Sequence, residues 1–439
     1  MGNLAHRLSL RIAKTPSRLM QASAPAVRTL SRPEFVVLAL FAVALPLVEA
    51  PKNVFWFLFL VLWFVGSIRQ RNFGQLARGW DWVFAALIVA PVASILNTAY
   101  APQWKEVGDI IGYVSLGWMI ARSRLDAQQI KWLLLCLVGA TLLGALHGGW
   151  VMATDPKRIW LQLNSVGHVN HSALYGAGAA ALAAAWIAAA WQTLARGPRL
   201  IGLGVALLMF GMMIAFASRG ALIAYLFAVV VLVPVLSAVR LRTLGLVALV
   251  AVGLAVGAQL LTVQLMGGRN NQTVIQKTLD GLRSGKLSSY RVETYHTATE
   301  MIRQYPLTGV GAANFSAVSP EAVQAWVEAR GEPFVRDDYY FSSHAHGLFT
   351  NTLGERGLLG ISALLALTIG WSAALLRRKP GAGATLDARL CWGAGVAGWS
   401  VVFIGGLFNT TLHHEHGMLG MVCLGLLLSG APLRVKAAA

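Results

Sequence analysis

The sequence has few charged residues and very few cysteines, and these shortages exclude several classes of protein. Only 12% of its 439 residues are charged, about half the fraction of a typical soluble chain. The three cysteines (Cys136, Cys391 and Cys423) all lie in apolar runs, so we expect neither a disulfide framework nor a cysteine metal cluster. The sequence also lacks a phosphate-binding glycine loop, a nucleophile elbow and a zinc-protease helix motif. Nucleotide chemistry is therefore not indicated.

Long apolar runs are abundant instead. Hydrophobic residues make up 56% of the chain, and the mean hydropathy is +0.61. Runs of this length and continuity are what a helix needs to cross a bilayer. We therefore predict an all-α polytopic membrane protein with about twelve transmembrane helices. The expected spans are residues 35–50, 53–68, 81–99, 107–121, 131–153, 170–193, 199–217, 220–239, 243–266, 346–376, 388–411 and 417–433.

The formal net charge of +18 does not indicate a nucleic-acid partner, because the basic residues occur in short clusters between the apolar runs. After the basic N-terminal tail, these clusters fall in every second loop, which is the pattern of the positive-inside rule. We therefore expect both termini in the cytoplasm and the intervening loops on the opposite side. The clusters lie at residues 69–78, 122–131, 196–199, 240–242, 377–389 and 434–436.

The alternation divides the chain into five parts. Residues 1–34 form a basic cytoplasmic segment without the apolar core of a cleaved signal. Spans one to nine occupy residues 35–266, and a polar extracytoplasmic segment occupies residues 267–343. Spans ten to twelve occupy residues 344–433, and residues 434–439 form a cytoplasmic tail.

The polar segment has the signals of a folded helical domain. Ser319 and Pro320 provide an N-cap and a first-turn proline, and Gly331 closes the helix that follows. A second helix is expected over residues 288–304, stopped by Pro306. The large loop is therefore expected to be a helical domain.

Three residues have the chemistry to act on a phosphate or a hydroxyl group. Arg219 lies in a gap between apolar runs that is too short for a solvated loop, so it either snorkels as an anchor or clamps a phosphate. Arg291 occupies a helix first turn, where the macrodipole disfavours a cation; it is either a solvated surface residue or held there by a partner. His346 begins the tenth span, where a neutral imidazole can act as a general base; a structural histidine is the alternative.

Five further residues are candidates for substrate contacts. His344 lies beside His346 at the boundary between loop and membrane. Asn170 and His171 open the sixth span on the same outer face. Tyr295 lies on the apolar face of the helix over residues 288–304. Arg303 lies late in that helix, where its favourable interaction with the macrodipole also explains it.

Two histidine groups, in residues 168–171 and 413–416, have the residue types of metal ligands. Neither shows a helical i, i+4 ligand pair with a nearby carboxylate, so we expect them to line a polar cavity and expect no metal. Asn351 and Glu355 share a face of the tenth span, and we expect Glu355 to form a structural buried pair with a neighbouring helix.

In combination these motifs resemble the O-antigen ligase family, whose superfamily also holds O-antigen polymerases and bacterial protein O-oligosaccharyltransferases. The resemblance covers roughly residues 160–365. Gly347 stands where members often have asparagine, and the spacing to Glu355 favours His346 over His344 as the matching histidine. The resemblance is carried by Ser218-Arg219-Gly220, by Arg291, by Pro306-Leu307-Thr308-Gly309-Val310-Gly311-Ala312-Ala313-Asn314-Phe315, by His344-Ala345-His346-Gly347-Leu348-Phe349 and by Glu355-Arg356-Gly357-Leu358-Leu359-Gly360.

The resemblance implies a glycosyltransferase of the GT-C type in the bacterial inner membrane, with its active site facing the periplasm. It implies that O-antigen passes from undecaprenyl diphosphate to a sugar hydroxyl of lipid A–core by an inverting transfer without a metal or other cofactor. Arg219 and Arg291 would then bind the diphosphate, and His346 would be the base. The alternatives are a polymerase or a protein O-oligosaccharyltransferase of the same superfamily, or, in a different class, a twelve-span transporter.

Overall fold

The computed structural model describes residues 28–77, 79–237, 241–265, 274–284 and 290–429. Its helices are α2 (Arg32–Leu47), α3 (Glu49–Gln70), α4 (Trp80–Leu96), α5 (Trp104–Ala121), α6 (Ala127–Thr154), α7 (Val169–Ala190), α8 (Arg196–Ala215), α9 (Arg219–Leu236), α10 (Leu241–Leu265), α11 (Val274–Ser284), α12 (Arg291–Gln304), α13 (Pro320–Glu328), α14 (Leu348–Arg377), α15 (Leu386–Trp399) and α16 (His414–Ser429). Short 3₁₀ helices are η1 (Phe315–Ala317), η2 (Arg336–Asp338) and η4 (Gly405–Leu407), and η3 (Ser400–Ile404) is a π-helix. The strands β1 (Arg28–Thr29) and β2 (Ser123–Arg124) pair in parallel.

Helices α2 to α10 and α14 to α16 correspond, one for one, to the expected spans. Within the described residues, eight helical stretches are long and apolar enough to cross a membrane, and α4 is a shorter apolar helix. The predicted class, an all-helical polytopic membrane protein, is confirmed, and the total of about twelve crossings stays a prediction. The tails over residues 1–27 and 430–439 lie outside the described residues.

The helices begin one to four residues away from the expected starts of the spans, and two of these differences have a clear local cause. α2 starts at Arg32, because Pro33 suits a first turn and the Glu34 carboxylate accepts a hydrogen bond of 2.9 Å from the Ser31 N–H. The prediction that His346 begins the tenth span is wrong by two residues: α14 starts at Leu348. His346 has a left-handed backbone with φ 53°, which a helix cannot include.

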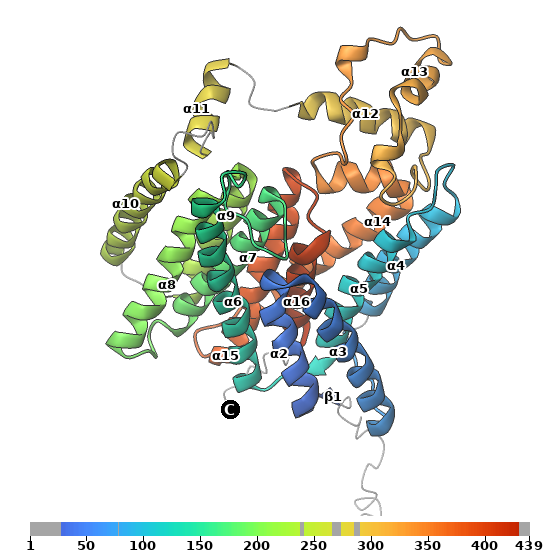
Figure 1. Cartoon of the computed structure of the whole chain (residues 1–439). Coiled ribbons are helices and arrows are strands. Elements are labelled where there is room, and N and C mark those ends of the chain that lie inside the picture. The colour runs from blue at the N-terminus through green and yellow to red at the C-terminus, as the bar shows by residue number, and fades with distance from the viewer. Residues whose placement is uncertain (1–27, 78, 238–240, 266–273, 285–289, 430–439) are drawn as a thin grey trace, which may run out of the picture.

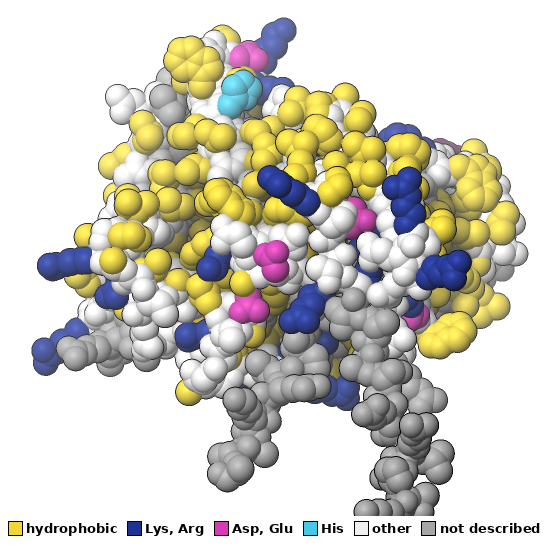
Figure 2. Space-filling model, turned by 90° about the horizontal axis from the view of Figure 1, so that it is seen from below, with side chains coloured by type: hydrophobic (Ala, Val, Ile, Leu, Met, Phe, Trp, Pro, Cys, Tyr) yellow, Lys and Arg dark blue, Asp and Glu magenta, His cyan; other side chains and the backbone are white. Residues whose placement is uncertain are grey.

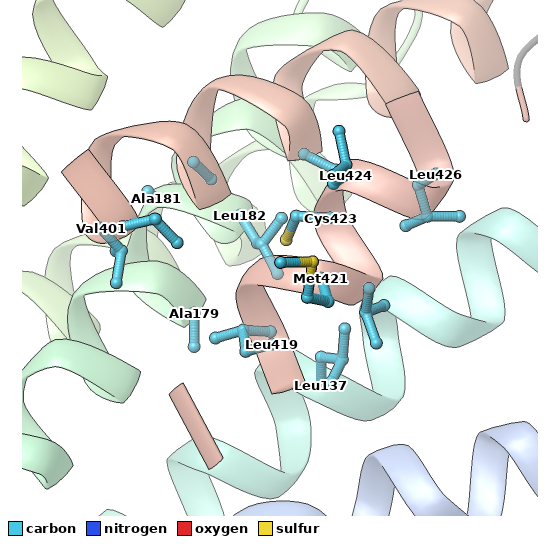
Figure 3. Packing of buried hydrophobic residues seen from close by; sticks show 14 of the residues in the cluster. Leu137, Ala179, Ala181, Leu182, Val401, Leu419, Met421, Cys423, Leu424 and Leu426 are labelled. Carbon is cyan, nitrogen blue, oxygen red and sulfur yellow. The ribbon is translucent and has the colours of Figure 1, made fainter. Parts of the chain in front are cut away.

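The centre of the bundle is α16, which packs against α5, α7 and α15 (Figure 1). Glycines let these helices approach closely: a Cβ added to Gly178 would lie 2.7 Å from Leu419, and one added to Gly398 would lie 2.5 Å from Cys423. Small residues at such crossings are how membrane helices gain van der Waals contact. Figure 3 shows Leu419 and Cys423 of α16 surrounded by side chains of α6, α7 and η3, including Leu137.

The two ends of the bundle differ in character. β1 and β2 lie at the lower end in Figure 1, and α12 and α13 lie at the upper end. At the lower end Arg28 is fully buried, pairs with Glu34 at 2.6 Å and donates to the Ser67 hydroxyl at 2.8 Å. Lys and Arg side chains are spread over this lower face (Figure 2). The alternation of basic loops predicts such a face on one side of the membrane.

Residues 291–343 of the polar segment form a small helical unit at the upper end of the bundle, which we call the polar unit. α12 and α13 pack around a buried apolar cluster that includes Met301 and Val323. The Ser319 hydroxyl accepts a hydrogen bond from the Ala322 N–H at 3.2 Å, and Gly331 has φ 75° just beyond the helix. The expected helix after Ser319 is confirmed. α12 begins at Arg291, and the predicted start at residue 288 lies outside the described residues.

This unit is fastened to the bundle where α14 is interrupted at Gly357, which has φ 58° and ψ −154°. The Leu358 and Leu359 N–H groups donate to the Pro306 and Leu307 carbonyls, at 2.8 and 3.2 Å. In return, the Val310 and Gly311 N–H groups donate to the carbonyls of residues 354 and 355, both at 3.0 Å. A Cβ on Gly357 would lie 2.4 Å from the Leu307 carbonyl carbon. The Pro-x-x-Gly-x-Gly and Glu-x-Gly motifs therefore bind each other through their backbones.

Candidate functional site

A cavity of about 530 Å³ lies at the upper end of the bundle, beneath the polar unit. Its walls come from the start of α5, the start of α7, the turn before α14, the first turns of α14 and the connection before α16. All of these segments belong to loops or helix ends that the charge pattern predicts on the outer side. The polar residues of the lining are Gln103, Glu106, Asp109, Tyr113, His168, His171, Ser316, Ser343, His344, Asn351, Thr352, Glu355, Arg356, Thr410, His413 and His414.

Beside this cavity, Arg291 and the start of α9, where Arg219 lies, meet at Phe408. Arg291 is the first residue of α12; it donates to the Phe408 carbonyl at 3.1 Å, and its guanidinium carbon lies 5.8 Å from the centroid of the Phe408 ring. The start of α9 packs on the same residue, since a Cβ on Gly220 would lie 2.7 Å from the Phe408 Cβ. Burial lowers the pKa of Arg291, and the charge of Arg219 lowers it further. Two cations are thus held close together.

His346 adjoins this arginine pair. Burial lowers the pKa of its imidazole below the ordinary 6.5, and the charges of Arg291 and His168 lower it further. Its ring centroid lies 4.4 Å from that of His344. The hydroxyl of Tyr295, one turn along α12 from Arg291, lies 3.2 Å from the position of a Cβ on the neighbouring Gly347. Near neutral pH His346 is therefore an uncharged imidazole beside the Arg291 cation.

A buried polar chain fixes the backbone on which His344 and His346 sit. The Asn351 amide oxygen accepts the Ala345 N–H at 3.0 Å. The Asn351 side chain also hydrogen-bonds the Glu355 carboxylate, which in addition accepts backbone N–H groups of residues 313 and 315. Glu355 therefore binds the polar segment and Asn351, rather than the neighbouring helix that the sequence favoured as its partner.

His344 extends from this turn into the cavity lining. Its Nδ1 lies 2.8 Å from the Ser343 hydroxyl, and its side chain also hydrogen-bonds Asn409. Burial, and then the neighbouring His346, lower the pKa of His344 to about 4. Phe408 and Asn409 therefore contact both the arginine pair and the histidine turn. Neither residue was predicted from the sequence, although the polar run that starts at Asn409, at the predicted outer end of a span, was the available signal.

The remaining predicted residues fall in different places. His171 lines the cavity, and the Asn170 N–H donates to Nδ1 of His168 at 3.3 Å. Arg303 does not line the cavity. It forms ion pairs of 3.1 Å with Glu300 and 3.7 Å with Glu332 in the polar unit.

The structure brings together the two histidine groups that the sequence presents separately. The ring centroid of His171 lies 5.7 Å from that of His413, 4.9 Å from that of His414 and 5.2 Å from that of His416. One ligand nitrogen from each of His171, His413 and His414 can be chosen so that all three lie within 4.8 Å of one another. We call these three residues the histidine triad.

The fold and this cavity define a polytopic membrane protein that gathers its polar chemistry at one end of its helices. Compared with known families, residues 204–365 match the family described as O-antigen ligase. This match supports the family predicted from the motifs, whose members are glycosyltransferase-like enzymes that act on lipid-linked glycans. The matched region contains Arg219, Arg291 and His346 and ends before His413. No curated protein matches the chain.

Proposed function

We propose that the protein is an O-antigen ligase that transfers O-antigen polysaccharide from undecaprenyl diphosphate to a sugar hydroxyl of lipid A–core. The observation that carries the proposal is the meeting of the α9 and α12 starts at Phe408, with Arg291 close to Arg219 on one side and to His346 on the other. A lipid diphosphate and a sugar hydroxyl are the two groups that such a site suits. The family match supports a lipid-linked glycan as the donor.

The arginine pair acts on the leaving group. When the bond between the anomeric carbon and the diphosphate oxygen breaks, negative charge grows on that oxygen. Arg219 and Arg291 are preorganised cations that stabilise this charge without reorganisation at the moment of reaction. The pKa of Arg291 is lowered by burial and by Arg219, so an anionic ligand relieves an existing repulsion between the two cations.

His346 acts on the acceptor. A sugar hydroxyl is a poor nucleophile until a base takes its proton, and the lowered pKa of His346 keeps the imidazole neutral and ready to accept one. The hydroxyl oxygen then forms the new bond to the anomeric carbon from the face opposite the departing diphosphate. A single displacement of this kind inverts the anomeric configuration and releases undecaprenyl diphosphate.

The cavity beside His346 is the proposed site of lipid A–core. Its lining of His344, Asn351 and Glu355 offers hydrogen-bond partners for sugar hydroxyls. We place this end of the bundle at the periplasmic face of the inner membrane and the basic face of Figure 2 in the cytoplasm.

Complementation tests the proposal. The wild-type protein would be expressed in a Gram-negative strain that lacks its own ligase but makes a lipid-linked O-antigen and a lipid A–core that match this protein. The lipopolysaccharide ladder would be read on a gel. We expect wild type to restore the ladder, and the variants Arg219→Ala, Arg291→Ala and His346→Ala to lose it at equal membrane levels.

Well-expressed wild type that gives no ladder in the matched host would contradict the ligase assignment. Restored chain length in a polymerase-deficient host would then assign the protein as a polymerase, in which the same residues act on a glycan acceptor.

A further inference from the structure

The histidine triad is assembled from segments about 240 residues apart in the sequence. His171 lies in the first turn of α7, and His413 and His414 lie at the start of α16. Close packing of these two helices, through Gly178 against Leu419, sets the distance between the segments. Each segment alone lacks a metal-binding spacing, and only their packing creates a group of three.

The chemistry of the triad suits a metal ion with a preference for imidazole nitrogen. In a tetrahedral zinc site, with Zn–N of about 2.0–2.1 Å, ligand nitrogens lie about 3.4 Å apart. From a separation of at most 4.8 Å, a shift of less than about 1 Å by each side chain reaches that spacing.

One nitrogen of the triad lacks the partner that a metal ion would supply. The buried Nδ1 of His413 has no hydrogen-bond partner among the described residues. A cation near the three rings gives such a nitrogen a partner.

Carboxylates lie close enough to compensate the charge of a cation. Oε2 of Glu106 lies 3.9 Å from Nε2 of His413. Asp109 also lines the cavity, and its charge acts on His414. Carboxylates behind metal-binding imidazoles orient the rings and raise ligand basicity. Lys52 and Lys105 also act on His414, and Arg356 acts on His413, so the triad has both carboxylates and cations near it, whereas the arginine pair attracts anions.

We propose that His171, His413 and His414 form a divalent transition-metal site, suited to Zn²⁺, in the wall of the cavity. The site joins α7 to the connection before α16 and leaves a fourth coordination position towards the cavity. It goes beyond the proposed function and does not rest on it, since neither Arg291 nor His346 takes part. All three ligands lie outside the region matched to the family.

The test uses the full chain in detergent with a purification tag that contains no histidine. After treatment with a chelator and its removal, the protein would be titrated with Zn²⁺ and, separately, with Co²⁺. We expect one tightly bound Zn²⁺ per chain, the visible d–d absorption of tetrahedral Co²⁺, and a rise in Tm with Zn²⁺, because the metal binds only the folded state.

His171→Ala and His414→Asn should each weaken binding by more than about 100-fold, since losing a ligand exceeds the about 10–100-fold cost of losing an outer partner. Asparagine suits the left-handed backbone of His414, whose φ is 47°. His171→Cys should restore binding, because thiolate also ligates zinc. His147→Ala, an exposed histidine of α6, is the matched control and should bind as wild type does.

Two results would overturn the site. The first is that the wild-type protein takes up no stoichiometric Zn²⁺ and shows no tetrahedral Co²⁺ spectrum. This measurement does not depend on the folding of any variant. The other is binding that persists unchanged in both His171→Ala and His414→Asn. Neither result depends on glycan transfer, so the ligase assignment can stand or fall separately.

Discussion

The arginine pair and the histidine triad are neighbouring regions with opposite charge requirements. At the arginine pair, Arg219 lies close enough to Arg291 to lower its pKa, so the pair gains from an anion. At the triad, three partly exposed imidazoles lie near Glu106 and Asp109, so the group gains from a cation. The chain therefore gathers polar residues at one end of its bundle in two regions that differ in charge. Each region is matched to a different class of ligand.

The largest expected effect tests the role of the histidine beside the arginines. His346→Ala should lower the rate of glycan transfer by about 10²–10⁴-fold, the usual contribution of a general base. The rate would be measured in proteoliposomes with purified donor and acceptor. His296→Ala is the matched control, because His296 is an exposed histidine of α12 that contacts the Asp338 carbonyl at 2.8 Å. A His346→Ala protein with wild-type turnover would remove the catalytic assignment.

The second largest effect on transfer is expected at the arginine pair. Arg291→Ala should lower transfer by about 10²–10³-fold, comparable to the loss of one preorganised donor to a developing anion. Arg336→Ala serves as the control because Arg336 makes the same kinds of contact, donating to a backbone carbonyl at 2.9 Å and lying 4.7 Å from an aromatic ring. Equal losses in the two variants would mean that any arginine of the polar unit matters only for folding.

A smaller effect is expected at the chain that fixes the histidine turn. Asn351→Ala leaves the Ala345 N–H and part of the Glu355 carboxylate without their partner, which costs about 1–3 kcal/mol of stability. We expect kcat to fall while the KM for the donor stays near wild type, because the arginines are untouched. Thermal unfolding and steady-state kinetics would be measured together. A rise in donor KM at unchanged kcat would contradict the positioning role.

The smallest effect concerns pH. A base acts in its neutral form, and burial together with Arg291 and His168 lowers the pKa of His346 from the ordinary 6.5. Transfer should therefore persist below pH 6.5 and be lost as pH falls through the lowered pKa. His168→Gln removes one of the positive influences and should move this acidic limb slightly upward. If wild-type transfer activity is already lost at pH 6.5 or above, the group that titrates is not a His346 with a lowered pKa.

The membrane class and the family motifs were readable from the sequence because each depends on local chemistry. Hydropathy is a property of single residues summed over a run, so the apolar runs predicted the helix starts to within four residues. The helix after Ser319 was predictable because its cap and its terminal glycine lie within a dozen residues. The turn before α14 was not predictable. The left-handed backbone of His346 depends on the hydrogen bond between the Ala345 N–H and Asn351 and on packing against α12.

By itself the sequence determined an all-helical membrane protein, a polar helical unit, and motifs that resemble one family and include Arg219, Arg291 and His346. Only the tertiary structure decided which distant segments meet. It brought Phe408 against Arg291 and the start of α9, bound Glu355 to the polar unit, and brought two histidine groups together as one triad. The physical reason is that helix neighbours are chosen by the fit of small and large side chains along whole faces, which no local spacing in the sequence records.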